Sequence, residues 1–411
     1  MNGRTTFKEF AATEGNSAWE ALVARPSALY SRGDDIRSAF ARDYTRILHS
    51  RAYRRLKHKT QVFFNIDNDH ICTRMEHVAH VESVSNTIAR KLELNDELTK
   101  AIAFGHDLGH APFGHHGEKI LDELSRKHLG IAFWHERNGL RFVDKVELLE
   151  DNYKIEKNLD LTYAVRDGIV SHCGELDENG LRPREELIDL ETFREAGQYQ
   201  PATWEGCVVK IADKIAYIGR DIEDAASLGF LEEAQLEQLR KMARANDEKV
   251  LNTTVIMHNM IIDICQNSNP TDGICLSRKY LEQLNEIKRF NYEYIYKNPR
   301  FSAFQHYAQL VLTEIFDTLW RYRGGDVWQK IGRERKYYPT LLSTFSEWLA
   351  KYCETDFVPD GELKDRAERC DNIKIYGRLE NERVYAQAAL DYIAGMTDRF
   401  AVKVFEELLT Y

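Results

Sequence analysis

The sequence of 411 residues has few of the residues that interrupt regular secondary structure. It contains 8 prolines and 23 glycines, too few for the many tight turns of a fold built from short strands. No apolar run reaches the roughly 18 residues that indicate a membrane-spanning helix. Residues 1–15 also lack the apolar core of a secretion signal. We therefore expect a helical protein with no membrane partner.

Cysteine and positive charge are also limited. The 7 cysteines include no C-x-x-C pair, and their odd number fits reduced thiols in a cytoplasmic protein better than a disulfide framework. The formal net charge of −10 gives no general attraction to nucleic acid or anionic lipid, and it repels nucleotides. Any phosphate-binding site must therefore gather positive charge locally.

Such a gathering occurs at residues 42–59, with the sequence RDYTRILHSRAYRRLKHK. The segment contains several arginines and lysines and a single acidic residue, Asp43. A run of this kind is typical of a solvated helix face, but it is also a place where phosphate could bind. The charge pattern alone leaves both interpretations open.

Apolar residues recur at steps of three and four through most of the chain, which is the spacing of an amphipathic helix. Residues 75–92 show it with Val78, Val81 and Ile88, and Asp96 can cap the next helix, which ends at the sequence GHDLGH. Further helices are predicted at 118–129, 136–149, 205–228, 231–244, 251–266, 278–296, 303–322, 340–352 and 381–409.

Strand signals are weak. Period-two alternation is limited to short hairpin pieces near 179–195. Loops are predicted near 151–160, 174–202, 267–277, 322–336 and 353–366. We therefore predict an all-α fold in one compact unit, with an N-terminal arm and basic helix at 1–60, a catalytic core at 61–230 and a helical extension at 231–411.

Histidines concentrate in residues 106–135, within GHDLGHAPFGHHGE and FWHE. Adjacent side chains on a regular helix point about 100° apart, so His106 and Asp107 can share one metal only where the helix ends or bends. Gly105 and Gly109 would supply that freedom. Imidazole nitrogen with carboxylate oxygen suits Mn, Fe, Ni or Zn, or Mg when water completes the shell.

Two further ligands are expected from other helices. His77 precedes His106 by 29 residues, a separation that suits an antiparallel helix pair, and Asp213 lies in a later amphipathic segment. His80 is the alternative first ligand. Each histidine taken singly has a structural explanation, such as capping or core packing. The spacing of the whole set, with its glycines, indicates a metal site.

A candidate for proton transfer follows the metal motif. His115 lies nine residues after His106, and Glu118 lies one helical turn after His115. A histidine and a carboxylate at this spacing face each other on a helix, so the carboxylate can orient the imidazole and raise its basicity. The pair could therefore act as a general acid or base.

Six segments follow one another in a set order: RILHSRAYRRLKHKTQVF at 46–63, R-x-x-H at 74–77, GHDLGHAPFGHHGE at 105–118, FWHE at 133–136, DKIAYIGRD at 213–221 and YIAGMTDRFA at 392–401. Together they resemble the HD-domain deoxynucleoside triphosphate (dNTP) triphosphohydrolases, particularly the bacterial dGTPase-like enzymes. The resemblance covers 28–230 well and 381–405 more loosely. The chain has E-H-V-A-H-V where the family commonly has T-H-S/T-L-E-V, but the Arg74 spacing favours His77 over His80.

The resemblance implies an HD-domain helical bundle whose C-terminal extension completes the nucleotide pocket and the oligomer contacts. It implies metal-dependent hydrolysis of dGTP or several dNTPs to deoxynucleoside and tripolyphosphate. The metal ligands are then His77, His106, Asp107 and Asp213, and the catalytic residues are His115, Glu118 and His135.

The resemblance also implies substrate contacts. Tyr217 would pack on the deoxyribose, and Asp221 and Gln61 would hold the 3′-hydroxyl. Lys214 directly follows Asp213, and Arg74 lies one turn before His77, so by their positions both could face the phosphates. Arg54, with other arginines of the basic run, and Tyr392, with the stretch 395–399, are further candidates. By contrast, His110 and His116 are expected to order the loop, and Lys57 and Lys59 to be surface cations.

Two other functions share some of these features. An HD phosphodiesterase or nucleotidase acting on another nucleotide would keep the metal ligands but not the His115–Glu118 pair or the D-K-x-x-Y-x-x-x-D pattern of 213–221. A non-catalytic nucleotide-sensing regulator would carry a degenerate site. The resemblance further suggests a homo-oligomer, for instance a hexamer, and activation by dNTP or single-stranded DNA at the basic run.

Overall fold

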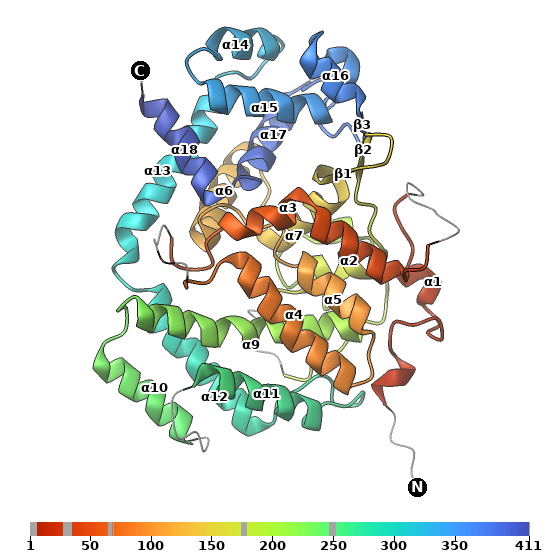
Figure 1. Ribbon diagram of the computed structural model, residues 1–411, viewed down its shortest axis with the longest axis vertical. Coiled ribbons are helices and arrows are strands. Elements are labelled where there is room, and N and C mark those ends of the chain that lie inside the picture. Colours follow the sequence, from red (N-terminus) through yellow and green to blue (C-terminus); the bar gives the residue numbers. More distant parts are fainter. Residues whose placement is uncertain are drawn as a thin grey trace.

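A computed structural model gives the fold over residues 6–27, 35–64, 68, 70–173, 179–245 and 252–410 (Figure 1). Helices form its framework, which confirms the all-α prediction. Within these ranges, no helix is long and apolar enough to cross a membrane. Residues 1–5 and 28–34 of the expected N-terminal arm, the start of the predicted loop 174–202 and the start of the predicted helix 251–266 lie outside the described residues.

The helices up to residue 227 are α1 (Trp19–Leu22), α2 (Ala39–His49), α3 (Arg51–Arg55), α4 (Arg74–Lys91), α5 (Asp96–Gly105), α6 (Gly114–Leu129), α7 (His135–Arg141), α8 (Tyr163–Ser171) and α9 (Trp204–Ser227). The later helices are α10 (Glu233–Ala245), α11 (Thr253–Asn267), α12 (Arg278–Phe290), α13 (Phe301–Trp320), α14 (Val327–Glu334), α15 (Pro339–Tyr352), α16 (Glu362–Glu368), α17 (Glu382–Ala394) and α18 (Asp398–Leu409). Short 3₁₀ turns lie at Phe7–Glu9, Leu56–His58, Leu190–Thr192 and Thr355–Phe357, and π-helical turns at Phe142–Val146 and Asn291–Tyr296.

One small sheet accompanies the helices, in the order β1 (Leu148–Glu150), β2 (Glu156–Asn158) and β3 (Cys370–Asp371). Strands β1 and β2 pair antiparallel, whereas β2 and β3 pair in parallel and so join the core to the extension. The hairpin pieces expected near 179–195 reduce to one isolated bridge between Leu181 and Ile274.

Side-chain caps set the start of the three helices that carry the candidate site. Thr73 caps α4 and forms a capping box with Glu76, and Thr203 caps α9. The cap of α5 is Asn95, whereas the sequence pattern placed it at Asp96, which is the first helical residue. Both side chains suit a helix start, so composition alone did not separate them.

Helix α4 lies at the centre of the catalytic half, packed against α5 and α9, while α5 also packs against α2 and α8. The extension contacts this half at both ends. Helices α11 and α12 pack on α9, and α13 runs along one side of the molecule to α6, α17 and α18 (Figure 1). The division at residues 60 and 230 stays a prediction.

Several predicted elements need correction. The helix expected at 381–409 is two helices, because α17 ends at Ala394 and Thr397 caps the start of α18. The helix expected at 136–149 ends at Arg141, followed by a π-helical turn and β1. Helix α14 lies inside a predicted loop, α16 begins inside another and extends beyond it, and α8 was not predicted. Helices of 7 to 9 residues carry too few apolar repeats for the pattern to stand out.

The glycines around His106 and Asp107 allow close packing rather than unusual backbone angles. Neither Gly105 nor Gly109 adopts the left-handed conformation. A Cβ on Gly109 would lie 2.1 Å from the backbone nitrogen of Gly139 and from the carbonyl oxygen of His135. The metal motif therefore lies directly against the backbone of α7.

We predict that Gly109→Ala destabilises the protein, because two backbone segments would have to separate. Overpacking of this kind costs about 1–3 kcal/mol or more. The control is Gly332→Ala in α14, where an added Cβ would have no described heavy atom within 4 Å. There alanine should stabilise by about 0.5–1 kcal/mol through its helix propensity. Denaturant unfolding measures both, and an equal effect at the two positions would contradict the packing role of Gly109.

Candidate metal centre and active site

The four predicted ligands lie where α4, α9 and the end of α5 meet. Ligand atoms of His77, His106 and Asp213 all lie within 4.8 Å of one another, and those of His106, Asp107 and His172 form a second such group. Helix α5 ends at Gly105, and the following turn presents His106 and Asp107. The Nε2 atom of His77 lies 3.0 Å from Oδ1 of Asp213, 3.4 Å from Nε2 of His106 and 3.9 Å from Oδ2 of Asp107. The Nε2 atom of His106 lies 3.5 Å from Oδ1 of Asp107 and 3.8 Å from Oδ1 of Asp213.

These separations fit a divalent ion. Metal–ligand bonds of about 2.0–2.2 Å place ligand atoms roughly 3 to 4 Å from one another. The ring of His106 donates from Nδ1 to the Ala103 carbonyl at 2.7 Å, which leaves the Nε2 lone pair for a metal. His80, the alternative ligand, is exposed and lies in a groove against α11.

The Asp107 carboxylate is held from two sides. Nη1 of Arg74 donates to Oδ2 at 2.9 Å, and Nε2 of His110 donates to Oδ1 at 3.0 Å. Burial alone would raise the pKa of Asp107, but its interactions with His110, His106 and Arg74 hold it well below its usual range. Asp107 is therefore ionised, which is the form in which a carboxylate could bind a metal.

Asp213 is also ionised. Burial would raise its pKa, but the hydrogen bond from His77 and the charges of His77 and His106 lower it to about 2. The same contact raises the pKa of His77 against the effect of burial. Two ionised aspartates beside two histidines give a donor set attractive to a divalent cation.

The predicted catalytic residues form a second cluster beside the first. Nδ1 of His135 lies 3.1 Å, and Nδ1 of His115 3.5 Å, from Oε2 of Glu118. Burial lowers the pKa of His135, but Glu136 and Glu118 raise it overall to about 10. His135 is thus a cation paired with Glu118, while the side chain of His115 is 64% exposed and faces solvent. The ring of His110 stacks on His135 at 3.8 Å and joins the clusters.

Sequence reasoning missed His172, at the end of α8. Its ring lies 5.0 Å from His106 and 5.5 Å from His135, and its Nδ1 donates to the Ile169 carbonyl at 2.7 Å. Burial and the neighbouring histidines lower its pKa to about 3, so the ring is neutral. Position 172 follows an unpredicted helix and belongs to no recognised motif, so the sequence held no signal for it.

Other predicted substrate residues lie along α9. Lys214 is buried, and Tyr217 is half-buried against the core. Asp221 is buried, and its Oδ2 accepts a hydrogen bond of 2.5 Å from the hydroxyl of Tyr296, a second residue that the sequence did not reveal. Burial raises the pKa of Asp221 to about 6. Its Oδ1, and Oε1 of Gln61, are buried without a partner in the described part of the chain.

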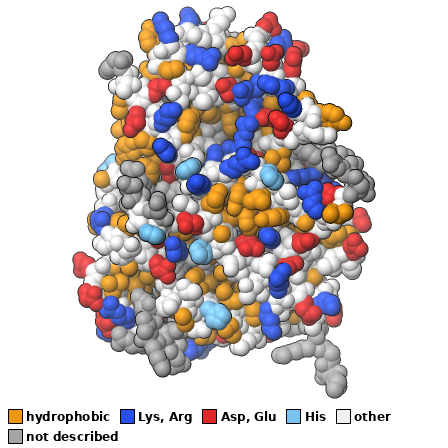
Figure 2. Space-filling view, viewed as in Figure 1, with side chains coloured by type: hydrophobic (Ala, Val, Ile, Leu, Met, Phe, Trp, Pro, Cys, Tyr) orange, Lys and Arg blue, Asp and Glu red, His pale blue; other side chains and the backbone are white. Residues whose placement is uncertain are grey.

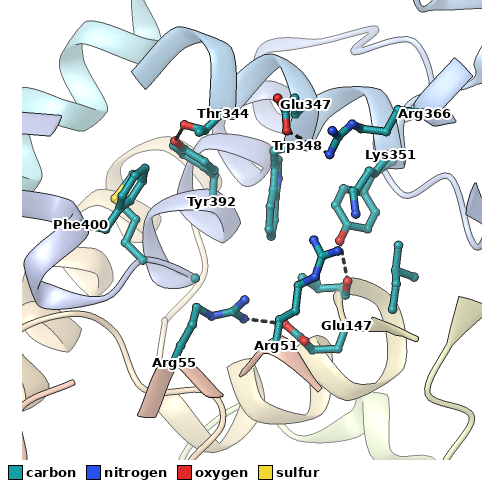
Figure 3. A pocket seen from close by; sticks show the side chains of 15 residues that line it. Arg51, Arg55, Glu147, Thr344, Glu347, Trp348, Lys351, Arg366, Tyr392 and Phe400 are labelled. Carbon is teal, nitrogen blue, oxygen red and sulfur yellow. Dashed lines mark hydrogen bonds and ion pairs between the residues drawn. The ribbon is translucent and has the colours of Figure 1, made fainter. Parts of the chain in front are cut away.

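The remaining candidates lie elsewhere. Arg54 is exposed on α3. Tyr392 is buried on α17, bonded to Thr344 at 2.5 Å (Figure 3). It lines a cavity of about 190 Å³ whose described lining includes none of the four predicted metal ligands.

Several arginines of the basic run at 42–59 bind other groups of the protein. Arg46 is buried against the Leu159 and Asp160 carbonyls, while Arg51 pairs with Glu156 and Arg55 with Glu147. Arg51 and Arg55 also line the cavity that contains Tyr392 (Figure 3). In Figure 2 this region shows Lys and Arg side chains around a hollow in the upper half of the face.

Lys59 is not a surface cation, contrary to prediction. It is 2% exposed, and its ammonium group donates to the carbonyls of His110 and Ala394. Burial lowers its pKa to about 7. The charge pattern of residues 42–59 predicts a solvated face. It could not reveal that the end of α17, a distant segment, covers Lys59.

Comparison with known proteins identifies the family of the chain. The HD domain family matches residues 74–218, and the phosphohydrolase-associated domain family matches residues 274–327. The chain is 34% identical over 375 residues to a deoxyguanosinetriphosphate triphosphohydrolase-like protein of Caldanaerobacter subterraneus, covering 91% of this chain and 86% of the relative. A protein of the same description from Desulfatibacillum aliphaticivorans is 37% identical over 379 residues, covering 91% and 88%. The chain therefore belongs to the deoxyguanosinetriphosphate triphosphohydrolase-like family and is a phosphohydrolase of the HD type.

Proposed function

We propose that the protein hydrolyses dNTPs, with dGTP among its substrates, to deoxynucleoside and tripolyphosphate. The observation that carries this proposal is the convergence of His77, His106, Asp107 and Asp213 beside the His115–Glu118–His135 cluster. The names of the relatives support the substrate class. In the reaction, water attacks the α-phosphorus, the bond from phosphorus to the sugar 5′-oxygen breaks, and that oxygen gains a proton.

The residues divide this work. When bound to the four ligands, a divalent ion would supply Lewis-acid polarisation of phosphate oxygen. His115, exposed beside Glu118, either takes the proton from the attacking water or gives one to the leaving 5′-oxygen. Glu118 orients that imidazole, and the His135 cation holds Glu118 in place. Developing negative charge would be met by Lys214 and by Arg74, whose Nη2 has no partner among the described residues.

The sugar would be recognised by Tyr217 and Asp221, which lie one turn apart on α9. Tyr217 would pack on the deoxyribose, where a 2′-hydroxyl would clash. The 3′-hydroxyl would donate its one proton to Oδ1 of Asp221 or to Oε1 of Gln61, two acceptors that find no other partner in the described ranges. A buried acceptor that pairs only with the correct substrate discriminates strongly, because the wrong substrate leaves it unpaired.

Product analysis tests the proposed reaction directly. Purified protein incubated with each dNTP and Mn or Mg should release deoxynucleoside and tripolyphosphate, separable by ion-exchange chromatography. The matching ribonucleotide is the control and should lose most of the activity, because of the clash at Tyr217. A monophosphate product would instead assign the protein to another class of HD hydrolase.

Loss of metal ligands should remove metal and turnover together. His106→Ala or Asp107→Ala leaves three donors and disturbs the paired charges of the site, so bound metal and activity should both disappear. His80→Ala, outside the cluster, should keep both. Elemental analysis of the purified variants, alongside the rate, decides the matter; a fully active metal-free variant would refute the ligand assignment.

Removal of the proton-transfer group should spare the metal. His115→Ala should lower kcat by roughly 10²–10⁴-fold with metal content unchanged, because none of the four ligands contacts His115. The adjacent His116, which packs against Phe304 at 5.6 Å, provides the matched control, and its alanine variant should stay within a few-fold of wild type. An unchanged rate in His115→Ala would exclude the assigned role.

A further inference from the structure

The break between α17 and α18 places a buried carboxylate beside residues 106–113, which join α5 to α6 and are called the catalytic loop below. Asp398, the first residue of α18, is 5% exposed. Its Oδ1 accepts the backbone N–H of Phe113 and its Oδ2 that of Thr60, both at 2.8 Å. The two segments are 285 and 338 residues away along the chain. One side chain of the extension therefore joins two separate segments of the catalytic half.

The first of these bonds holds a conformation that is otherwise unfavourable. Phe113 caps the start of α6 with left-handed backbone angles, φ 65° and ψ 23°, and Gly114 follows with φ 60°. A non-glycine residue persists there only when its surroundings impose it. Because His115 and Glu118 lie in the first turns of α6, the backbone angles at Phe113 set the direction in which that pair points.

The second bond holds the segment that precedes Gln61. Thr60 forms a bridge with Thr73, the capping residue of α4, and the backbone N–H of Arg74 donates to the Lys59 carbonyl at 3.2 Å. Thus the segment fixed by Asp398 is continuous with the start of the helix that carries Arg74 and His77.

Lys59 strengthens the same joint. Its ammonium group donates to the carbonyl of His110 in the catalytic loop and to that of Ala394 at the end of α17. Three side-chain bonds to the backbone therefore join the end of α17 and the start of α18 to the segments 59–60 and 110–113. A fourth, from Lys59 to His110, joins those two segments to each other.

We propose that Asp398 is a positioning residue for hydrolysis, which holds the turn before α6 so that the His115–Glu118 pair meets the substrate. This inference rests on the proposed function. Misplacement of a reacting group by about 1 Å costs on the order of 10²-fold in rate. Asp398→Asn replaces one accepting oxygen by an NH2 group, which cannot accept from a backbone N–H. We therefore expect kcat to fall by about that factor while metal content is kept.

Asp263 in α11 offers a matched control. It is 7% exposed, and its Oδ2 accepts the backbone N–H of Ser277, the residue before α12, at 2.6 Å. Neither residue contacts the catalytic loop. Asp263→Asn should therefore lower the melting temperature but leave kcat within a few-fold of wild type.

Hydrogen exchange tests the joint without reference to activity. Mass spectrometry of peptides that cover Thr60 and Phe113 should show faster exchange in Asp398→Asn, with wild-type exchange at both places in Asp263→Asn. Unaltered exchange would overturn the proposal. An inactive wild type would refute the proposed function instead, and this measurement would still report on Asp398.

A double-mutant cycle separates positioning from general destabilisation. If Asp398 acts through His115, Asp398→Asn should cost little further rate in a His115→Ala background. A repeated loss of about 10²-fold there, or a wild-type kcat in the single variant, would contradict the proposal. Should Asp398→Asn fail to fold, Asp398→Glu keeps the charge but displaces the oxygens, and the same cycle applies to it.

Discussion

A carboxylate in a protein interior is costly unless its charge is matched, and the architecture of the site depends on how this requirement is met at Asp107. Arg74 and His110 donate to its two oxygens, so a residue of α4 and a residue of the catalytic loop are fixed relative to the end of α5. His110 in turn stacks on His135. The bonds that stabilise this buried anion therefore also fix the orientation of a predicted metal ligand.

The same constraint explains why the two clusters are adjacent. Glu118 is a half-buried acid beside His135, and each stabilises the charge of the other. Neutral His110 and His172 lie between these charges and the predicted metal ligands. Alternating charged and neutral imidazoles avoid the repulsion that several cations in one buried region would create.

The sequence was sufficient for those parts of the fold that depend on local periodicity. Apolar residues at helical steps predicted α4, α9 and most of the long helices. The spacing of the histidines and aspartates predicted which residues could bind a metal. What it could not supply depends on contacts between distant segments. The burial of Lys59 by α17, the position of His172 and the Tyr296–Asp221 bond follow from tertiary packing that no local pattern records.

The distance along the chain between Phe113 and Asp398 has a consequence for synthesis. A ribosome that adds about 5–20 residues per second needs roughly 15 to 60 seconds for the intervening segment. During that time the turn at Phe113 lacks the acceptor that holds its left-handed angles. The catalytic half of a nascent chain is therefore made before the bond from Phe113 to Asp398 can form. The loop acquires its final shape only when α18 packs against it.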